Sequence, residues 1–224
     1  RLGTRVTGGS PYAIRQEEHV RRSGPQLSGK RIVIDPGTAG LHALSTGSVA
    51  ELESRVLWDL AARLEGRMAA AGMETFLSHD GRGHASDDER ARVANLVDAD
   101  MMISLRCGHY DTPGANGVAS FYFGSNRGSY STIGRNLADF IQREIVARTP
   151  LTDCRVRERT WDILRLTRMP VALIDVGYIT NPDDAKVLDD PHYRNVITEA
   201  ILVAVKRLYL LGENDRPTGC LLYT

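Results

Sequence analysis

The sequence has no excess charge of either sign and no long apolar run. Its 224 residues contain 28 Lys and Arg against 28 Asp and Glu, so the formal net charge is zero. Because a dedicated nucleic-acid binder normally carries a surplus of basic residues, this balance argues against one. The longest apolar stretches, such as 171–176 and 200–205, are far shorter than the roughly 18 residues that suggest a membrane span. We therefore expect a globular domain that neither binds nucleic acid nor spans a membrane.

Cysteine is scarce as well. The three cysteines, Cys107, Cys154 and Cys220, are odd in number and widely spaced. This pattern fits neither a disulfide framework nor a CxxC zinc clip. Because reduced thiols are typical of the cytosol, we predict a cytoplasmic location.

The composition changes along the chain and suggests three parts. Residues 1–30 are rich in Gly, Ser, Pro, Arg and Gln, as expected of a linker or an arm from a preceding domain. Residues 31–211 alternate between strand-like and helix-like patterns and form the predicted domain. Residues 212–224 form the predicted C-terminal tail.

Strand and helix patterns alternate through the predicted domain. The expected strands are 31–35, 73–77, 100–105, 118–123 and 171–176, and the expected helices are 53–71, 86–97, 130–148 and 193–211. Ser86 and Glu89 match a capping box at the start of the second helix. We read the segment before the last strand, which contains several arginines, as a loop. The alternation predicts an α/β fold with a mainly parallel central sheet and helices on both faces.

In such a sheet, ligands bind at the carboxyl ends of the strands, here 35–40, 106–109 and 175–180. The segments at and around these ends, 32–40, 103–108, 117–124 and 169–188, resemble successive motifs of the zinc-dependent N-acetylmuramoyl-L-alanine amidases of the amidase_3 type. The resemblance covers residues 31–211 and implies that fold. Members of the family cut the amide bond between N-acetylmuramic acid and the L-alanine of the peptidoglycan stem peptide.

The family's metal-binding motif is altered in this sequence. In the family, zinc is held by a His after Asp-Pro-Gly, a Glu on the following helix and a His that ends the Ile-Ser-x-His strand. A Glu before Val-Gly acts as the catalytic base. The resemblance places Thr38 and Arg106 at the two His positions and Asp175 at the position of the base. The helix carboxylate is kept as Glu53, or as Glu51 if the register is shifted.

These replacements predict that zinc and hydrolase activity are lost. A guanidinium is always protonated and has no lone pair to offer, so Arg106 cannot ligate a metal ion. Instead, we expect Arg106 to pair with Glu53, Asp175 or both, which would compensate their charges. The resulting prediction is a pseudoenzyme with no catalytic residues and no metal.

An alternative keeps the activity. His42 and His109 lie close in sequence to Thr38 and Arg106, and they could act as displaced ligands together with Glu53. The protein would then be an active peptidoglycan amidase with non-standard metal ligands. A third possibility is a module that binds peptidoglycan or its precursors without cutting them.

The chain resembles a regulatory branch of the family whose members have lost the zinc ligands. This resemblance implies a cytoplasmic regulator of peptidoglycan precursor synthesis that acts by protein–protein contact. It also implies phosphorylation by a Ser/Thr protein kinase, after which the protein stimulates UDP-N-acetylglucosamine enolpyruvyl transferase. A forkhead-associated protein, the lipid II flippase and a muramyl peptide are further implied partners. Thr218 and Thr224, in the predicted tail, are candidate phosphorylation sites.

Overall fold

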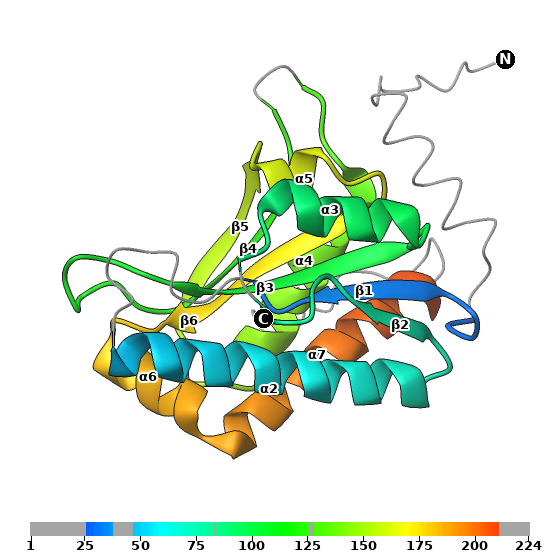
Figure 1. Cartoon of the computed structure of the whole chain (residues 1–224). Coiled ribbons are helices and arrows are strands. Elements are labelled where there is room, and N and C mark those ends of the chain that lie inside the picture. The colour runs from blue at the N-terminus through cyan, green and yellow to red at the C-terminus, as the bar shows by residue number, and fades with distance from the viewer. Residues whose placement is uncertain (1–25, 38–46, 83, 126–127, 211–224) are drawn as a thin grey trace, which may run out of the picture.

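The computed structural model describes residues 26–37, 47–82, 84–125 and 128–210. Within them, six strands form one sheet in the order β2-β1-β3-β6-β4-β5 (Figure 1). The strands are β1 (Arg31–Asp35), β2 (Glu74–Leu77), β3 (Met101–Gly108), β4 (Val118–Phe123), β5 (Asp153–Arg159) and β6 (Val171–Tyr178). Every neighbouring pair is parallel except β4 and β6, which are antiparallel. The prediction of a mainly parallel sheet in an α/β fold is confirmed.

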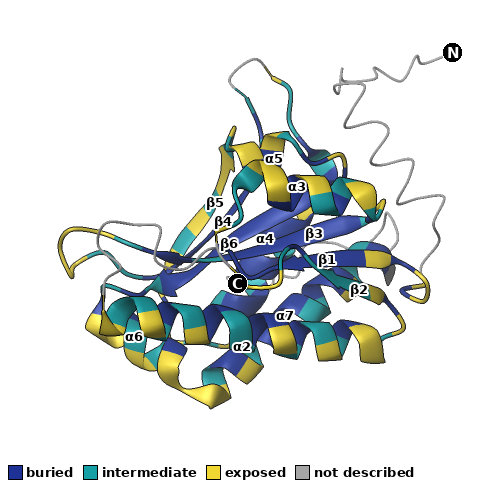
Figure 2. Ribbon diagram, in the orientation of Figure 1, coloured by how far each residue is buried: buried dark blue, intermediate teal, exposed yellow. Residues whose placement is uncertain are grey.

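Helices cover both faces of the sheet. They are α2 (Ser48–Ala70), α3 (Asp87–Leu96), α4 (Thr132–Val146), α5 (Asp162–Arg165), α6 (Pro182–Asp189) and α7 (Pro191–Leu210). Buried side chains of α2, α4 and α7 form the larger core with one face of the sheet, whereas α3 and α5 contribute to the smaller core on the other face. Figure 2 shows the strands β1, β3, β4 and β6 largely buried between these layers, with exposed residues on the outer sides of the helices.

The two cores explain which side chains of β3 are available at the site. Successive side chains of a strand point to opposite faces. Ile103, Leu105 and Cys107 belong to the larger core, and Met102 belongs to the smaller one. Arg106 therefore projects on the face of the smaller core. The helices there are short, ten residues in α3 and four in α5, so they leave part of this face free for a pocket.

The predicted capping box is present at the start of α3, with Ser86 and Glu89 each accepting a hydrogen bond from the other's backbone N–H. Several other elements differ from the sequence-based prediction. Helix α2 begins at Ser48 rather than at residue 53. The segment 153–159, read as a loop, is the strand β5, and its alternating Arg and Glu residues are typical of the solvent-exposed edge of a sheet. The short helix α5 was also not predicted.

Parts of the predicted organisation fall outside the described residues. Most of the predicted arm, residues 1–25, and the predicted tail are among them. Within the described part of the chain, no helix is both long enough and apolar enough to cross a membrane.

Candidate functional site

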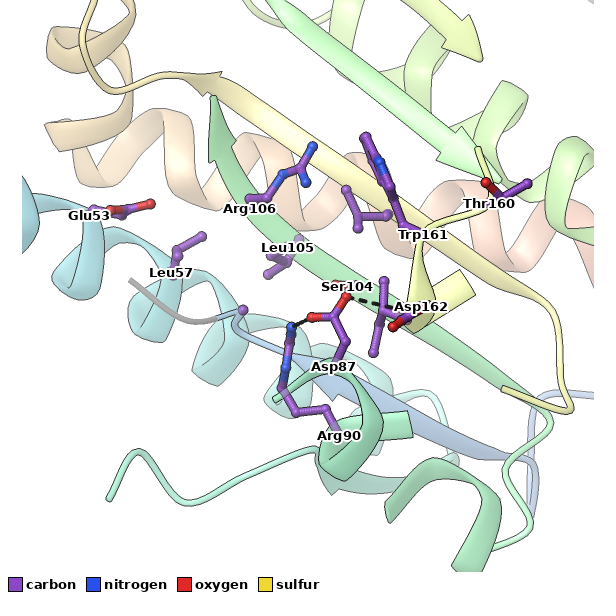
Figure 3. A pocket seen from close by; sticks show the side chains of 13 residues that line it. Glu53, Leu57, Asp87, Arg90, Ser104, Leu105, Arg106, Thr160, Trp161 and Asp162 are labelled. Carbon is purple, nitrogen blue, oxygen red and sulfur yellow. Dashed lines mark hydrogen bonds and ion pairs between the residues drawn. The ribbon is translucent and has the colours of Figure 1, made fainter. Parts of the chain in front are cut away.

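The carboxyl ends of β1, β3 and β6 lie next to one another, and a pocket lies beside them. Asp35 of β1 is in register with Ser104 of β3, and Arg106 of β3 is in register with Asp175 of β6. The pocket has a volume of about 550 Å³ and is lined by residues of β3 and β6, of α2, and of α3 and α5 (Figure 3). This volume lies within the usual range for small-molecule sites.

A bidentate ion pair between Arg106 and Asp175 joins β3 to β6 at the pocket. The Nε of Arg106 donates to Oδ1 of Asp175 at 2.6 Å, and its Nη2 donates to Oδ2 at 3.0 Å. The Asp175 side chain is only 10% exposed, so the guanidinium compensates a largely desolvated carboxylate. The guanidinium carbon also lies 4.4 Å from the ring centroid of Trp161, which is a cation–π contact. Arg106 is thus held on two sides.

A second pair lies at the start of α2. Nε2 of His109, just after β3, is hydrogen-bonded to Oε1 of Glu53 at 2.9 Å, and both side chains are 2% exposed.

Burial raises the pKa of the Cys107 thiol well above its ordinary value, and the negative charges of Glu53 and Asp175 raise it further. Cys107 is therefore protonated at neutral pH and is not a reactive thiolate.

A buried network fixes the end of β1. Asp35 is fully buried and accepts hydrogen bonds from the hydroxyls of Ser78 and Ser104, each at 2.6 Å, and from Nη1 of Arg90 at 2.5 Å. Burial alone would lower the pKa of Arg90, but the carboxylates of Asp35 and Asp87 raise it overall. Gly37 follows with φ 61°, and its backbone N–H donates to Asp35. These bonds set the direction in which the chain leaves β1 toward residue 38.

The structure brings together three of the residues that the motifs singled out. Glu53 and Arg106 line the pocket, and Asp175 is bound to Arg106. His109, proposed as a displaced ligand, contacts Glu53. Four other predicted positions lie outside the described residues, namely Thr38, His42, Thr218 and Thr224.

Sequence reasoning missed Arg90 and Trp161, which both line the pocket. Arg90 follows the capping box and looked like an ordinary residue of an amphipathic helix. Trp161 follows the unpredicted strand β5, so nothing local placed it beside Arg106. Only the tertiary contacts show that these side chains belong to the site.

The described residues do not fit the zinc site of the family. A catalytic zinc ion needs about three protein ligands, usually imidazoles and a carboxylate. The resemblance places Arg106 at one of the ligand positions, and its guanidinium is bound to Asp175. In residues 26–37, 47–82, 84–125 and 128–210, no group of three His, Cys, Asp or Glu side chains is placed to hold a metal ion.

With this fold and this arrangement of strand ends, the chain belongs to the N-acetylmuramoyl-L-alanine amidase family, whose model matches residues 32–207. It is 63% identical to the N-acetylmuramoyl-L-alanine amidase CwlM of Mycobacterium tuberculosis, over 97% of the chain and 54% of that protein. It is 28% identical to the probable cell wall amidase LytH of Staphylococcus epidermidis, over 84% of the chain and 61% of that protein. The chain thus spans a little over half the length of these relatives.

Solved structures agree with this assignment. The amidase AmiC2 of Nostoc punctiforme superposes with a TM-score of 0.69 and 25% identity, over 80% of this chain and 96% of that one. The resemblance to the amidase family that the motifs indicated is confirmed.

The prediction that the chain is not an enzyme is wrong. A relative that is 63% identical is named an N-acetylmuramoyl-L-alanine amidase, and the fold is that of the solved amidases. The prediction rested on the three replaced positions, Thr38, Arg106 and Asp175. The fold is that of the family, and Glu53, which the resemblance places at the helix carboxylate, lines a pocket.

Proposed function

We propose that the chain binds the muramoyl-peptide part of peptidoglycan, or of its precursors, in the pocket at the carboxyl ends of β3 and β6. One observation carries the proposal. The pocket is lined by Glu53 and Arg106, with Asp175 bound to Arg106, and these residues stand where the resemblance places two metal ligands and the catalytic base of the family. The names of the relatives, which refer to the N-acetylmuramoyl-L-alanine bond, support the same class of ligand.

Arg106 has a definite role in this proposal. It supplies the positive charge that zinc supplies in the family, and it does so beside the carboxylate of Asp175. Its Nη1 group forms no hydrogen bond with any residue that the structure describes. This group is thus available to a carbonyl oxygen of the ligand, such as that of the muramoyl–L-alanine amide. Because Asp175 and Trp161 hold the guanidinium in place, little side-chain entropy is lost when the ligand binds.

Calorimetric titration with muramoyl-L-alanyl-D-isoglutamine tests the proposal. We expect Arg106→Ala to weaken binding at least about tenfold, because a charge-assisted hydrogen bond is lost. Arg92→Ala is the matched control, because Arg92 is exposed on α3, pairs with Asp88 and does not line the pocket. Equal affinities of the wild type and Arg106→Ala, or no binding at all, would overturn the proposal. Mass spectrometry of the same mixtures measures amide hydrolysis directly, as released L-alanyl-D-isoglutamine.

We further propose, on the resemblance alone, a role in controlling peptidoglycan precursor synthesis in the cytoplasm. Phosphorylation by a Ser/Thr kinase, with Thr218 and Thr224 as candidate sites, would allow the protein to stimulate UDP-N-acetylglucosamine enolpyruvyl transferase. The forkhead-associated protein and the lipid II flippase are the other proposed partners. The rate of the purified transferase, measured with the phosphorylated and the unphosphorylated chain, tests this role. An unchanged rate would contradict it.

A further inference from the structure

The edge strand β5 presents two arginines on the same face of the sheet as the pocket. Arg157 is in register with Phe121 of β4, which belongs to the smaller core. Glu158 is in register with Tyr122, which packs against the larger core on the other face. Because successive side chains of a strand alternate, Arg157 and Arg159 both project on the face of the smaller core. We call these two residues the β5 arginine pair.

Aromatic rings hold Arg159 beside the pocket. Its guanidinium carbon lies 5.4 Å from the ring centroid of Phe121 and 5.6 Å from that of Trp161. The guanidinium carbon of Arg106 lies 5.8 Å and 4.4 Å from the same two centroids. Trp161 lines the pocket and, in Figure 3, lies between Arg106 and Thr160. A cation–π contact restrains a guanidinium without occupying its N–H donors, so these donors remain available to a ligand.

The β5 arginine pair has no carboxylate partner in the part of the chain that the structure describes. Arg159 donates one hydrogen bond, from Nη1 to the backbone carbonyl of Glu158 at 2.8 Å, and this acceptor carries no charge. The exposed side chain of Arg157 has no acceptor among the described residues. Both positive charges are therefore left without a negative partner within this part of the chain.

The carboxylates at the pocket do not neutralise this pair, because each of them is already bound by another side chain. The bound pairs are Glu53 with His109, Asp87 with Arg90, Asp162 with Arg165 and Asp175 with Arg106. The β5 arginine pair thus favours an anion that comes from outside the described part of the chain.

We propose that the β5 arginine pair binds a phosphate group at the rim of the pocket. Residues two apart on a strand are about 6.6 Å apart, so the two long side chains can converge on one anion. A phosphate ester carries up to two negative charges and three strong acceptor oxygens, which match two guanidinium groups, whereas a carboxylate carries one charge. Thr160 directly follows Arg159 and lines the pocket, so an organic group esterified to the phosphate would extend past Thr160 and Trp161 into the pocket.

This inference does not depend on the proposed function, because the β5 arginine pair is not among the residues proposed to contact the muramoyl peptide. Calorimetric titrations with inorganic phosphate, phenyl phosphate and acetate test it. We expect both phosphates to bind at least about tenfold more tightly than acetate. Tighter binding of phenyl phosphate than of inorganic phosphate would identify a phosphate ester as the ligand, and equal affinities would identify free phosphate.

Substitutions locate the site. Arg157→Gln and Arg159→Gln should each weaken the binding of inorganic phosphate at least about tenfold. Arg143→Gln is the matched control and should leave the affinity unchanged. Arg143 also lies against an aromatic ring, at 5.3 Å from the centroid of Phe140, and forms no ion pair within the described residues, but its helix α4 packs on the opposite face of the sheet.

Three results would overturn the inference. They are the absence of phosphate binding, affinities for phosphate and acetate that are equal, and phosphate binding that is unchanged in both arginine variants. Thermal unfolding shows whether each variant is folded. Should Arg159→Gln disturb the packing around Trp161, the Arg157→Gln variant decides the matter, because the side chain of Arg157 is exposed.

Discussion

At the scale of single residues, the pair of Arg106 and Asp175 joins β3 to β6 at the site. The two residues face each other because β3 and β6 are parallel neighbours in register at these positions. A guanidinium matches a carboxylate with two parallel hydrogen bonds, which a lysine could not do. The positive charge at the strand ends therefore belongs to the protein and is fixed by its fold.

Removing the Arg106 side chain should destabilise the protein, because the Asp175 carboxylate then loses its ion-pair partner. Because Asp175 is largely buried, we expect Arg106→Ala to lower the free energy of unfolding by about 1–3 kcal/mol, allowing for the partial exposure of the arginine. Asp175→Asn in the same chain should recover part of this loss. Urea unfolding of both single variants and the double variant measures the coupling. A coupling near zero would show that water already screens the pair.

Gly37 allows a test of how closely the backbone after β1 approaches β3. It has φ 61°, and an added Cβ would lie 2.4 Å from the carbonyl oxygen of Leu105. Gly29 has φ 77°, but an added Cβ would meet nothing within 4 Å. Both Ala substitutions incur the strain of left-handed backbone, whereas only Gly37→Ala adds a clash. We expect Gly37→Ala to be less stable than Gly29→Ala by about 1–3 kcal/mol in thermal or urea unfolding. Equal losses would contradict the close approach of β1 to β3.

At the scale of elements, a buried arginine joins α2, α6 and α7. Nε of Arg194 in α7 donates to Asp59 of α2 at 2.5 Å, and its Nη1 donates to the carbonyls of Leu188 and Asp189 at the end of α6. Arg63 also donates to Asp59, at 2.7 Å. This set of bonds satisfies carbonyls at the end of a helix and holds the helices of the larger core together.

The pKa of Asp59 gives this set of bonds a pH dependence. Burial would raise that pKa, but the hydrogen bonds from Arg63 and Arg194 lower it overall below the ordinary 3.8. Ionised Asp59 therefore stabilises the fold at pH values above the ordinary pKa of 3.8. This stabilisation is lost as the pH falls through the lowered pKa of the folded protein. We expect Asp59→Asn to cost about 1–2 kcal/mol at pH 7 and progressively less below pH 4 in urea unfolding. A cost that did not change with pH would contradict the assignment.

The elements also show what the sequence could reveal. The apolar strands β1, β4 and β6 and the capping box of α3 were predicted, because local pattern and burial agree there. The strand β5 was missed because an exposed edge favours charged residues, which resemble a loop. At the site, the motifs located Glu53, Arg106 and Asp175. They gave no sign of Arg90 or Trp161, whose roles depend on contacts between distant segments.

At the scale of the whole molecule, the unequal covering of the sheet creates the site. In the part of the chain that the structure describes, long helices pack over one face and the short helices α3 and α5 cover the other, and the pocket lies beside Arg106 on this second face. The fold and family are those of the N-acetylmuramoyl-L-alanine amidases. We propose that the charges at the pocket, with Arg106 bound to Asp175, recognise the muramoyl peptide.

The most direct test of this central claim is the affinity for muramoyl-L-alanyl-D-isoglutamine with and without zinc. The purified chain is titrated by calorimetry after treatment with a chelator and again after incubation with zinc, and its zinc content is measured in both states. Because we propose that Arg106 provides the positive charge at the site, we expect the same dissociation constant in both titrations. Binding that requires zinc, together with about one tightly held zinc ion per chain, would contradict the proposal.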